Sequence, residues 1–218
     1  MNEEALAFLS GPEGRAVLAR LSDADLGEAR TLSLLADLRK VLPADLAGAA
    51  LTLARLRERG AAKFSRTSAM FFTPDALEQA SGEAIARYRA RCFAEAGYTQ
   101  IADLGCGIGG DALALAGVPG ARVIGVDRDL LRLKMARANV RAYGHQVDWL
   151  CADLRDPLPL HGVPAAFFDP ARREDGRRIF SVRDYHPPLD TIRAWPFEAL
   201  AVKLSPGVSL DELAPYTG

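Results

Sequence analysis

The sequence predicts a doubly wound α/β domain preceded by a small all-helical domain. From residue 97 onward, short apolar runs alternate with helical segments, a pattern typical of a parallel sheet with right-handed crossovers. A glycine-rich run at residues 105–110 follows the first of these strands, as it does in Rossmann-like folds. Residues 1–60 show no strand pattern. We therefore divide the chain into a helical domain at 1–60 and an α/β core at 61–218.

The helical domain is predicted from the spacing of its apolar residues, which recur three and four positions apart, as on one face of a helix. In its first part these residues are Leu6, Leu9, Val17, Leu18 and Leu21. A further helix is expected over 46–59, ending at Gly60. Residues 61–75 lack this periodicity, so we expect them to connect the two domains.

The α/β core contains a series of predicted helices and strands. A Thr-Pro pair at 73–74 has the form of an N-cap followed by a first helical residue, so a helix is expected from 74 to about 96. Two more helices are expected at 111–116 and 129–143. The strands are expected at 101–104, 122–126, 147–150, 165–168 and 200–204.

Composition narrows the possible functions. The 27 basic and 28 acidic residues give a net charge of −1, so the chain as a whole has no electrostatic preference for nucleic acid. Its three cysteines lie far apart and its three histidines lack metal-ligand spacing, so neither disulfides nor a metal site is expected. No apolar run is long enough to span a membrane, and the acidic N-terminus does not resemble a signal peptide. We expect a cytoplasmic protein that binds neither a metal nor a membrane.

Three acidic residues stand at the ends of predicted strands around the glycine turn. Asp103 lies two residues before the first glycine, where a carboxylate can meet a ligand ammonium but would repel the diphosphate of a dinucleotide. Asp127 ends the second strand and can accept from both hydroxyls of a ribose. Asp153 follows the third strand and can accept from an adenine amino group. Each acid alone could instead cap a helix or lie on a surface loop, but together they predict an S-adenosylmethionine (SAM) site rather than an NAD site.

These motifs resemble those of RNA guanine-N2 methyltransferases of the trimethylguanosine synthase type. They resemble still more closely bacterial SAM-dependent methyltransferases that carry a THUMP-like domain after the catalytic core. The similarity covers about residues 63–207, and the segments that carry it are 103–111, 123–127, 136–140 and 143–144, together with Asp153. The resemblance implies a class I methyltransferase sheet, which usually has seven strands. Because only residues 205–218 follow the fifth predicted strand, we expect a sheet truncated there and a chain that is part of a longer protein.

The resemblance also implies which residues hold the cofactor. Residues 70–75 are similar to the Thr-Pro-Glu segment that contacts SAM in the cap-methylating enzymes, which points to Thr73. The implied cofactor contacts are Thr73, Asp103, Leu104, Gly105, Cys106, Gly107, Gly109, Asp127, Arg128, Asp153, Leu154 and Asp169.

The predicted acceptor site follows the fourth strand. Related enzymes that methylate amines have Asp/Asn-Pro-Pro-aromatic there; the first residue accepts from the amine and the ring stacks on the base. This chain has Asp169 and Pro170 but continues with Ala171 and Arg172. Arg172 could lie flat on a base or bind a phosphate. Tyr185 is the nearest aromatic that could replace the missing ring, and it could equally be an anchor in the hydrophobic core. We assign Asp169, Pro170 and Arg172 as the catalytic residues.

A basic segment from Arg172 to Arg183 follows this motif. Beside an active site it is a candidate phosphate-contacting loop, although its acidic residues equally suit an ordinary solvated loop. Together with the resemblance, this segment favours N-methylation of a guanine or adenine base in RNA. A methyltransferase of a small molecule or a protein, and a SAM-binding module without catalysis, stay open as alternatives.

Overall fold

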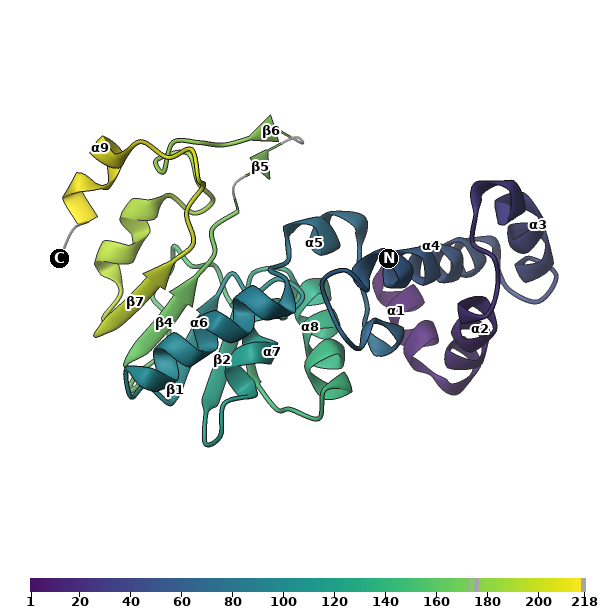
Figure 1. The fold of residues 1–218 in the computed structure, drawn as a ribbon, viewed down its shortest axis with the longest axis horizontal. Helices are drawn as coiled ribbons and strands as arrows, with labels where there is room; N and C mark the ends of the chain where they lie inside the picture. The colour runs from purple at the N-terminus through teal and green to yellow at the C-terminus, as the bar shows by residue number, and fades with distance from the viewer. Residues whose placement is uncertain (172, 175–176, 217–218) are drawn as a thin grey trace.

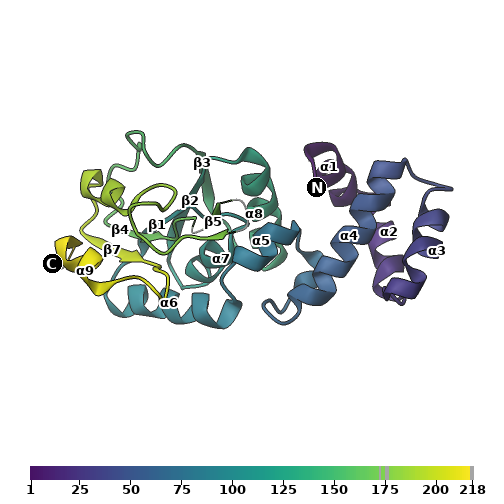
Figure 2. The same ribbon diagram turned by 90° about the horizontal axis from the view of Figure 1, so that it is seen from above.

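The computed structural model describes residues 1–171, 173–174 and 177–216. The N-terminal helices and the α/β core follow one another along the longest axis of the molecule (Figures 1 and 2). The N-terminal helices are α1 (Glu3–Ser10), α2 (Pro12–Ser22), α3 (Glu28–Leu38) and α4 (Ala44–Gly60). Among the described residues, no helix combines the length and the apolar composition that a membrane span requires.

The core is a five-stranded parallel sheet in the order β3-β2-β1-β4-β7. The strands are β1 (Gln100–Leu104), β2 (Arg122–Asp127), β3 (Asp148–Cys151), β4 (Ala165–Phe168) and β7 (Ala199–Val202). The order of strands reverses between β1 and β4, so the sheet is doubly wound and the predicted fold class is confirmed. In such a sheet a crevice opens at the carboxyl ends of the strands where the order reverses.

Both faces of the sheet are covered, as is usual for parallel sheets. Ile101 and Phe167 point to the face covered by α6 (Glu83–Glu95) and α7 (Gly110–Ala116). Leu104 and Phe168 point to the opposite face, covered by the long segment between β4 and β7. The remaining elements of the core are α8 (Leu130–Ala142), β5 (Arg173–Glu174), β6 (Arg177–Arg178), η2 (Leu189–Ala194), α9 (Leu210–Leu213) and η3 (Ala214–Tyr216).

The single helix expected from 74 to 96 is wrong, because the structure divides it into α5 (Pro74–Gln79) and α6. The physical reason is Lys63, which lies four residues before η1 (Thr67–Ala69) begins. Its ammonium donates to the carbonyls of Leu77, Glu78 and Ala80 at 2.7, 2.9 and 3.0 Å. These bonds satisfy carbonyls that would otherwise need N–H donors from a further turn of helix, so the helix can end here. The following Gly82 then starts α6 as its N-cap.

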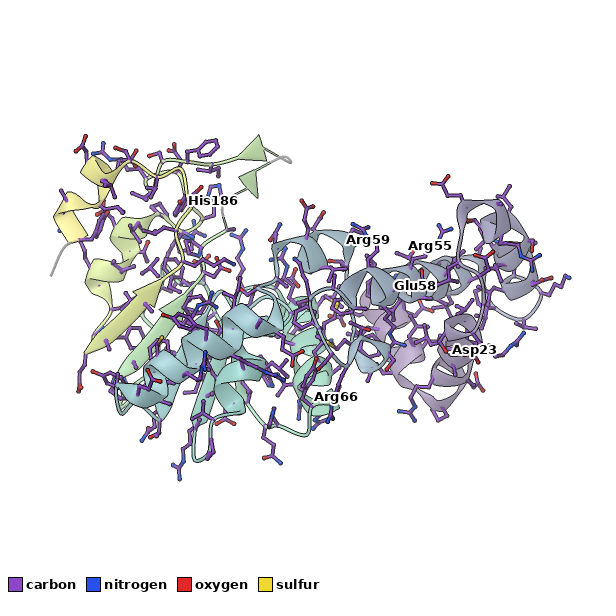
Figure 3. All side chains as sticks on the ribbon, viewed as in Figure 1. Asp23, Arg55, Glu58, Arg59, Arg66 and His186 are labelled. Carbon is purple, nitrogen blue, oxygen red and sulfur yellow. The ribbon has the colours of Figure 1, made fainter. Side chains whose placement is uncertain are left out.

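The N-terminal helices are joined to the core through α8. One hydrophobic cluster contains buried residues of α1, α2, α4 and α5 and reaches Met135 of α8. Asn139, fully buried on α8, accepts from the Phe71 N–H at 2.7 Å and donates to the Phe71 carbonyl at 3.1 Å. Arg66, labelled in Figure 3, donates to the Ala142 carbonyl at 3.0 Å at the end of the same helix. The helical region and α8 therefore share one core.

Candidate active site

A cavity of about 560 Å³ lies at the carboxyl ends of the strands. Four acidic residues in the last positions of strands or shortly after them reach its wall: Asp103, Asp127, Asp153 and Asp169. The glycine turn after β1 and residues 78–81 between α5 and α6 complete much of the wall. The topology thus brings to one cavity four carboxyl groups that are far apart in the sequence.

The glycine turn has a backbone shape that other residues rarely adopt. Gly105 has φ +76°, and a Cβ there would lie 3.0 Å from the Asp169 carbonyl oxygen. The N–H of Gly105 donates to the Val126 carbonyl at 2.8 Å, which ties the turn to β2. Gly109 has φ +80°, and a Cβ there would lie 3.1 Å from Cβ of Ala136. Because both positions lack a side chain, α7 starts close against α8 and the turn closes against the end of β4.

Asp127 fastens the glycine turn to the end of β2. One carboxylate oxygen accepts from the Gly107 N–H at 2.9 Å, and the other accepts from the Asp129 N–H at 2.9 Å. The residue is 7% exposed and lines the cavity. Each carboxylate oxygen can accept more than one hydrogen bond, so both can still accept from a pair of ligand hydroxyls.

Asp103 is a buried carboxyl group at the floor of the cavity. It is 1% exposed, and its Oδ2 has no hydrogen-bond partner among the described residues. Burial raises the pKa of Asp103 to about 7, and the nearby charges of Asp169 and Asp127 act in the same direction. A backbone hydrogen bond from Ala112 and the charge of Arg89 oppose this shift. A ligand ammonium would satisfy the unpaired oxygen and favour the ionised form.

At the end of β4 the structure shows a pair that the sequence did not predict. Lys203, directly after β7, places its ammonium 2.6 Å from Oδ2 of Asp169. The same ammonium donates to the Ser81 hydroxyl at 3.1 Å. The Lys203 and Asp169 side chains are 22% and 20% exposed, so the ion pair is largely shielded from water. A lysine at the end of a predicted strand was the only signal of this pair in the sequence.

Two family models match the chain. Residues 3–60 match a domain of unknown function, DUF8688, and residues 101–170 match a methyltransferase domain. An uncharacterized S-adenosylmethionine-dependent methyltransferase of Mycobacterium tuberculosis, present in strains CDC 1551 and H37Rv, is 36% identical over 165 residues. The match covers 72% of this chain and 44% of the relative. The chain therefore spans less than half the length of these curated relatives.

A solved structure has the same fold over the whole chain. It comes from a Porphyromonas gingivalis W83 protein assigned to the methyltransferases, with a TM-score of 0.71 and 24% identity. The match covers 100% of this chain and 53% of that protein. The strand order, the family match at residues 101–170 and the relatives that are 36% identical decide the family of the core. The chain contains a class I SAM-dependent methyltransferase domain.

The methyltransferase domain brings most of the predicted site residues to its cavity. The predicted residues that line it are Asp103, Gly105, Cys106, Gly107, Asp127, Arg128, Asp153, Leu154, Asp169 and Pro170. Leu104 and Gly109 belong to the adjoining strand and turn without lining the cavity. Thr73 lies elsewhere: its hydroxyl accepts from the Ala76 N–H at 3.2 Å, and it borders a separate hollow beside α1 and α4. Arg172 lies outside the described residues.

Asp153 is bound to Arg155 in this structure. Nε of Arg155 lies 2.9 Å from one carboxylate oxygen and a terminal guanidinium nitrogen lies 2.6 Å from the other. The hydrogen bonds from this side chain hold the pKa of Asp153 below its ordinary range. The adenine contact predicted for Asp153 would therefore have to share the carboxylate with Arg155, a residue that the sequence analysis did not select.

Of the two roles open for Tyr185, the structure confirms the core anchor, and the role of a replacement stacking aromatic is wrong. The side chain is 0% exposed in the hydrophobic core beneath the sheet face. Its hydroxyl accepts from the Ser205 N–H at 3.0 Å, which fixes the segment after β7. The neighbouring His186, labelled in Figure 3, reaches the cavity wall instead. Tyr185 is buried, whereas Asp184 and His186 on either side of it are exposed.

Arg89 is a further residue of the site that the sequence did not reveal. It lies on the face of α6 that packs on the sheet, with its guanidinium carbon 4.0 Å from the centre of the Phe167 ring. It forms an ion pair with Asp111, at the start of α7 and on the cavity wall. Burial lowers the pKa of Arg89, and the charges of Asp169 and Asp103 oppose this. An arginine among the buried alanines of α6 was the available signal.

We expect Asp127→Ala to weaken SAM binding about 100-fold, because two charge-assisted hydrogen bonds are worth roughly 3 kcal/mol. Isothermal titration calorimetry on the folded variant measures this. The exposed Asp156, which does not line the cavity, provides the matched control, and Asp156→Ala should bind SAM like the wild type. Unchanged affinity in Asp127→Ala, with an unchanged circular dichroism spectrum, would show that Asp127 does not hold the ribose.

Proposed function

We propose that this chain is the catalytic core of a SAM-dependent methyltransferase that methylates an amino nitrogen of a base in RNA. The observation that carries the proposal is the position of Asp169. It directly follows β4, lines the cavity, and its backbone lies against the glycine turn through Gly105. A carboxylate at that point can accept one N–H of an amine and hold the nitrogen in place.

The residues of the cofactor side fit SAM. The unpaired, buried oxygen of Asp103 suits the ammonium of the methionine part, and the two oxygens of Asp127 suit the ribose hydroxyls. When bound, SAM supplies a methyl group that its sulfonium has already activated. The protein has to place the acceptor in line and exclude water. Asp169 does the first by fixing the amine, so that the nitrogen lone pair is left to face the methyl group.

Asp169 also favours nitrogen over carbon as the acceptor atom. An amine becomes positively charged as it takes the methyl group and must then lose a proton. A carboxylate within hydrogen-bond distance stabilises this developing charge and can accept that proton. A carbon acceptor has no N–H to donate, so the Asp169 carboxylate could not position it in this way.

RNA is proposed as the substrate because of the segment beside the cavity. Arg183 and Phe180 border a second hollow, of about 510 Å³, that shares Ile179, His186 and Pro188 with the cavity. The Phe180 side chain is 54% exposed. An exposed ring beside arginine is the combination that proteins use for single-stranded RNA, through stacking and phosphate contacts. The other arginines of this segment are part of the proposal from the sequence alone.

The test is transfer of labelled methyl from SAM to total RNA taken from cells that lack the gene. Nucleoside mass spectrometry of the product should show one new N-methylated base, and binding of that RNA should weaken steeply with added salt. Transfer only to a protein or metabolite fraction would overturn the RNA proposal and keep the methyltransferase. SAM binding without transfer to any fraction would indicate a binding module.

A further inference from the structure

The ion pair between Lys203 and Asp169 lies where the acceptor is expected to bind. Lys203 does not itself line the cavity, but both of its partners, Asp169 and Ser81, do. Its ammonium is therefore directly behind the wall. A side chain in that place can set the direction and the charge of the carboxylate without touching the acceptor.

The lysine itself is held in place by the fold. Its backbone N–H donates to the Phe168 carbonyl at 2.9 Å, which extends the pairing of β4 and β7 by one residue. Two residues later, the Ser205 N–H donates to the buried Tyr185 hydroxyl. Both ends of the segment are thus anchored, and the ammonium reaches the two partners from a fixed backbone.

The charge of Lys203 also acts on the opposite wall. Burial lowers the pKa of Lys63, and the charge of Lys203 lowers it further. Lys63 in turn holds the carbonyls at residues 77, 78 and 80, next to Ser81. Two lysines therefore hold this part of the cavity wall. Lys63 binds the carbonyls at the end of α5, and Lys203 links Ser81, between α5 and α6, to Asp169 after β4.

We propose that Lys203 is the positioning residue of the acceptor subsite, and that it makes this subsite suited to a neutral amine. This inference rests on the proposed function, since it assigns the acceptor side of the same cavity. Lys203 fixes one oxygen of Asp169 and balances its negative charge. An acceptor that arrives uncharged, such as the exocyclic amine of a base, then meets a carboxylate whose charge is already paired. A protonated aliphatic amine, such as a lysine side chain, is attracted to this paired carboxylate less than to an unpaired one.

The charge balance can be measured without knowing the acceptor. Sinefungin carries a protonated amine where SAM carries its sulfonium methyl, whereas S-adenosylhomocysteine carries neither. The ratio of their dissociation constants therefore reports the charge at the acceptor subsite. In Lys203→Met the Asp169 carboxylate loses this cation, and the ratio should shift about tenfold toward sinefungin, as expected for one nearby charge at intermediate dielectric. Lys203→Arg, which keeps the cation, should leave the ratio within about twofold of the wild type.

A matched control is available on α8. Lys134 forms an exposed pair with Glu3 at 2.7 Å, away from the cavity, so Lys134→Met should not change the ratio. An unchanged ratio in Lys203→Met would overturn the inference. Loss of S-adenosylhomocysteine binding in this variant would also overturn it, because it would show that Lys203 only supports the structure of the cofactor site.

Methyl transfer gives an independent readout of the same variant. With RNA as acceptor, Lys203→Met should lower kcat roughly tenfold or more, because the acceptor is no longer held in line, and should change KM little. If wild-type protein transfers nothing to RNA, the proposed function fails while the ratio of the two ligands still decides the role of Lys203. If the wild type and Lys203→Met transfer methyl groups to RNA at the same rate, the inference about Lys203 fails and the proposed function stands.

Discussion

Asp103→Asn is expected to stabilise the methyltransferase domain and at the same time to weaken SAM binding about 100-fold. The pKa of Asp103 is raised to about 7 in the folded protein, chiefly by burial, so above that pH the fold carries an unpaired buried charge. Asparagine has no ionised form and removes this cost. The rise of the Asp103 pKa to about 7 corresponds to roughly 4 kcal/mol as an upper limit. The loss of affinity follows because the cofactor ammonium no longer meets a carboxylate.

The sign of the pH dependence follows from the raised pKa. Between about pH 4 and pH 7 the folded protein holds a proton that the unfolded chain has lost, so stability falls as the pH rises through this window. The gain in unfolding free energy from Asp103→Asn should therefore be largest at pH 8 and shrink toward pH 4. Wild-type SAM affinity should fall about tenfold per pH unit below pH 7, because only the ionised carboxylate pairs with the ammonium.

Urea unfolding and calorimetry at several pH values measure both effects. Asp148, exposed at the start of β3 in the same sheet, is the matched control, and Asp148→Asn should change neither quantity. An Asp103→Asn protein that is less stable than the wild type at pH 8 would contradict the assignment of a buried, unpaired charge.

Asp169→Ala is expected to reduce methyl transfer at least about 100-fold while SAM stays bound, since the variant loses the group that places the acceptor. Its effect on the cofactor should even be slightly favourable near neutral pH. The charge of Asp169 raises the pKa of Asp103, so its removal leaves Asp103 more fully ionised. Single-turnover transfer and SAM titration at pH 6.5 separate the two effects.

Two comparisons sharpen this prediction. Asp169→Asn keeps an accepting oxygen and should retain more activity than the alanine variant. The exposed Asp184, on the second hollow rather than the cavity, gives a control in Asp184→Ala that should leave the transfer rate per bound RNA unchanged. Full activity of Asp169→Ala would move the acceptor site away from the end of β4.

The strands and most helices could be predicted because each depends on its own residues. The apolar runs that form β1, β2 and β4 lie in the buried centre of the sheet, so the apolar character of their own residues predicts them directly. The break between α5 and α6 depends instead on Lys63, which lies 14 to 17 residues from the carbonyls it binds. Local periodicity contains no information about such a contact.

The candidate site divides in the same way. Asp103, Asp127 and Asp169 could be placed because the carboxyl ends of parallel strands meet at one edge of the sheet. The pair of Lys203 with Asp169 joins residues 34 apart, and its bond to Ser81 joins residues 122 apart. The packing between β4, β7 and the α5–α6 connection creates these contacts. For Tyr185 the sequence left a stacking role and a core role open, and only the packing of the folded chain decides for the core.

The bonds of Asn139 have a consequence for how the molecule unfolds. Both the N–H and the carbonyl of Phe71 depend on this one buried amide, and the surrounding cluster runs without interruption from α1 to α8. Separating the N-terminal helices from the sheet would expose that cluster and leave several polar groups unsatisfied in it. The helices and the sheet should therefore melt in a single cooperative transition. Amide hydrogens on α4 and on α8 should accordingly exchange with solvent at similar free energies of opening.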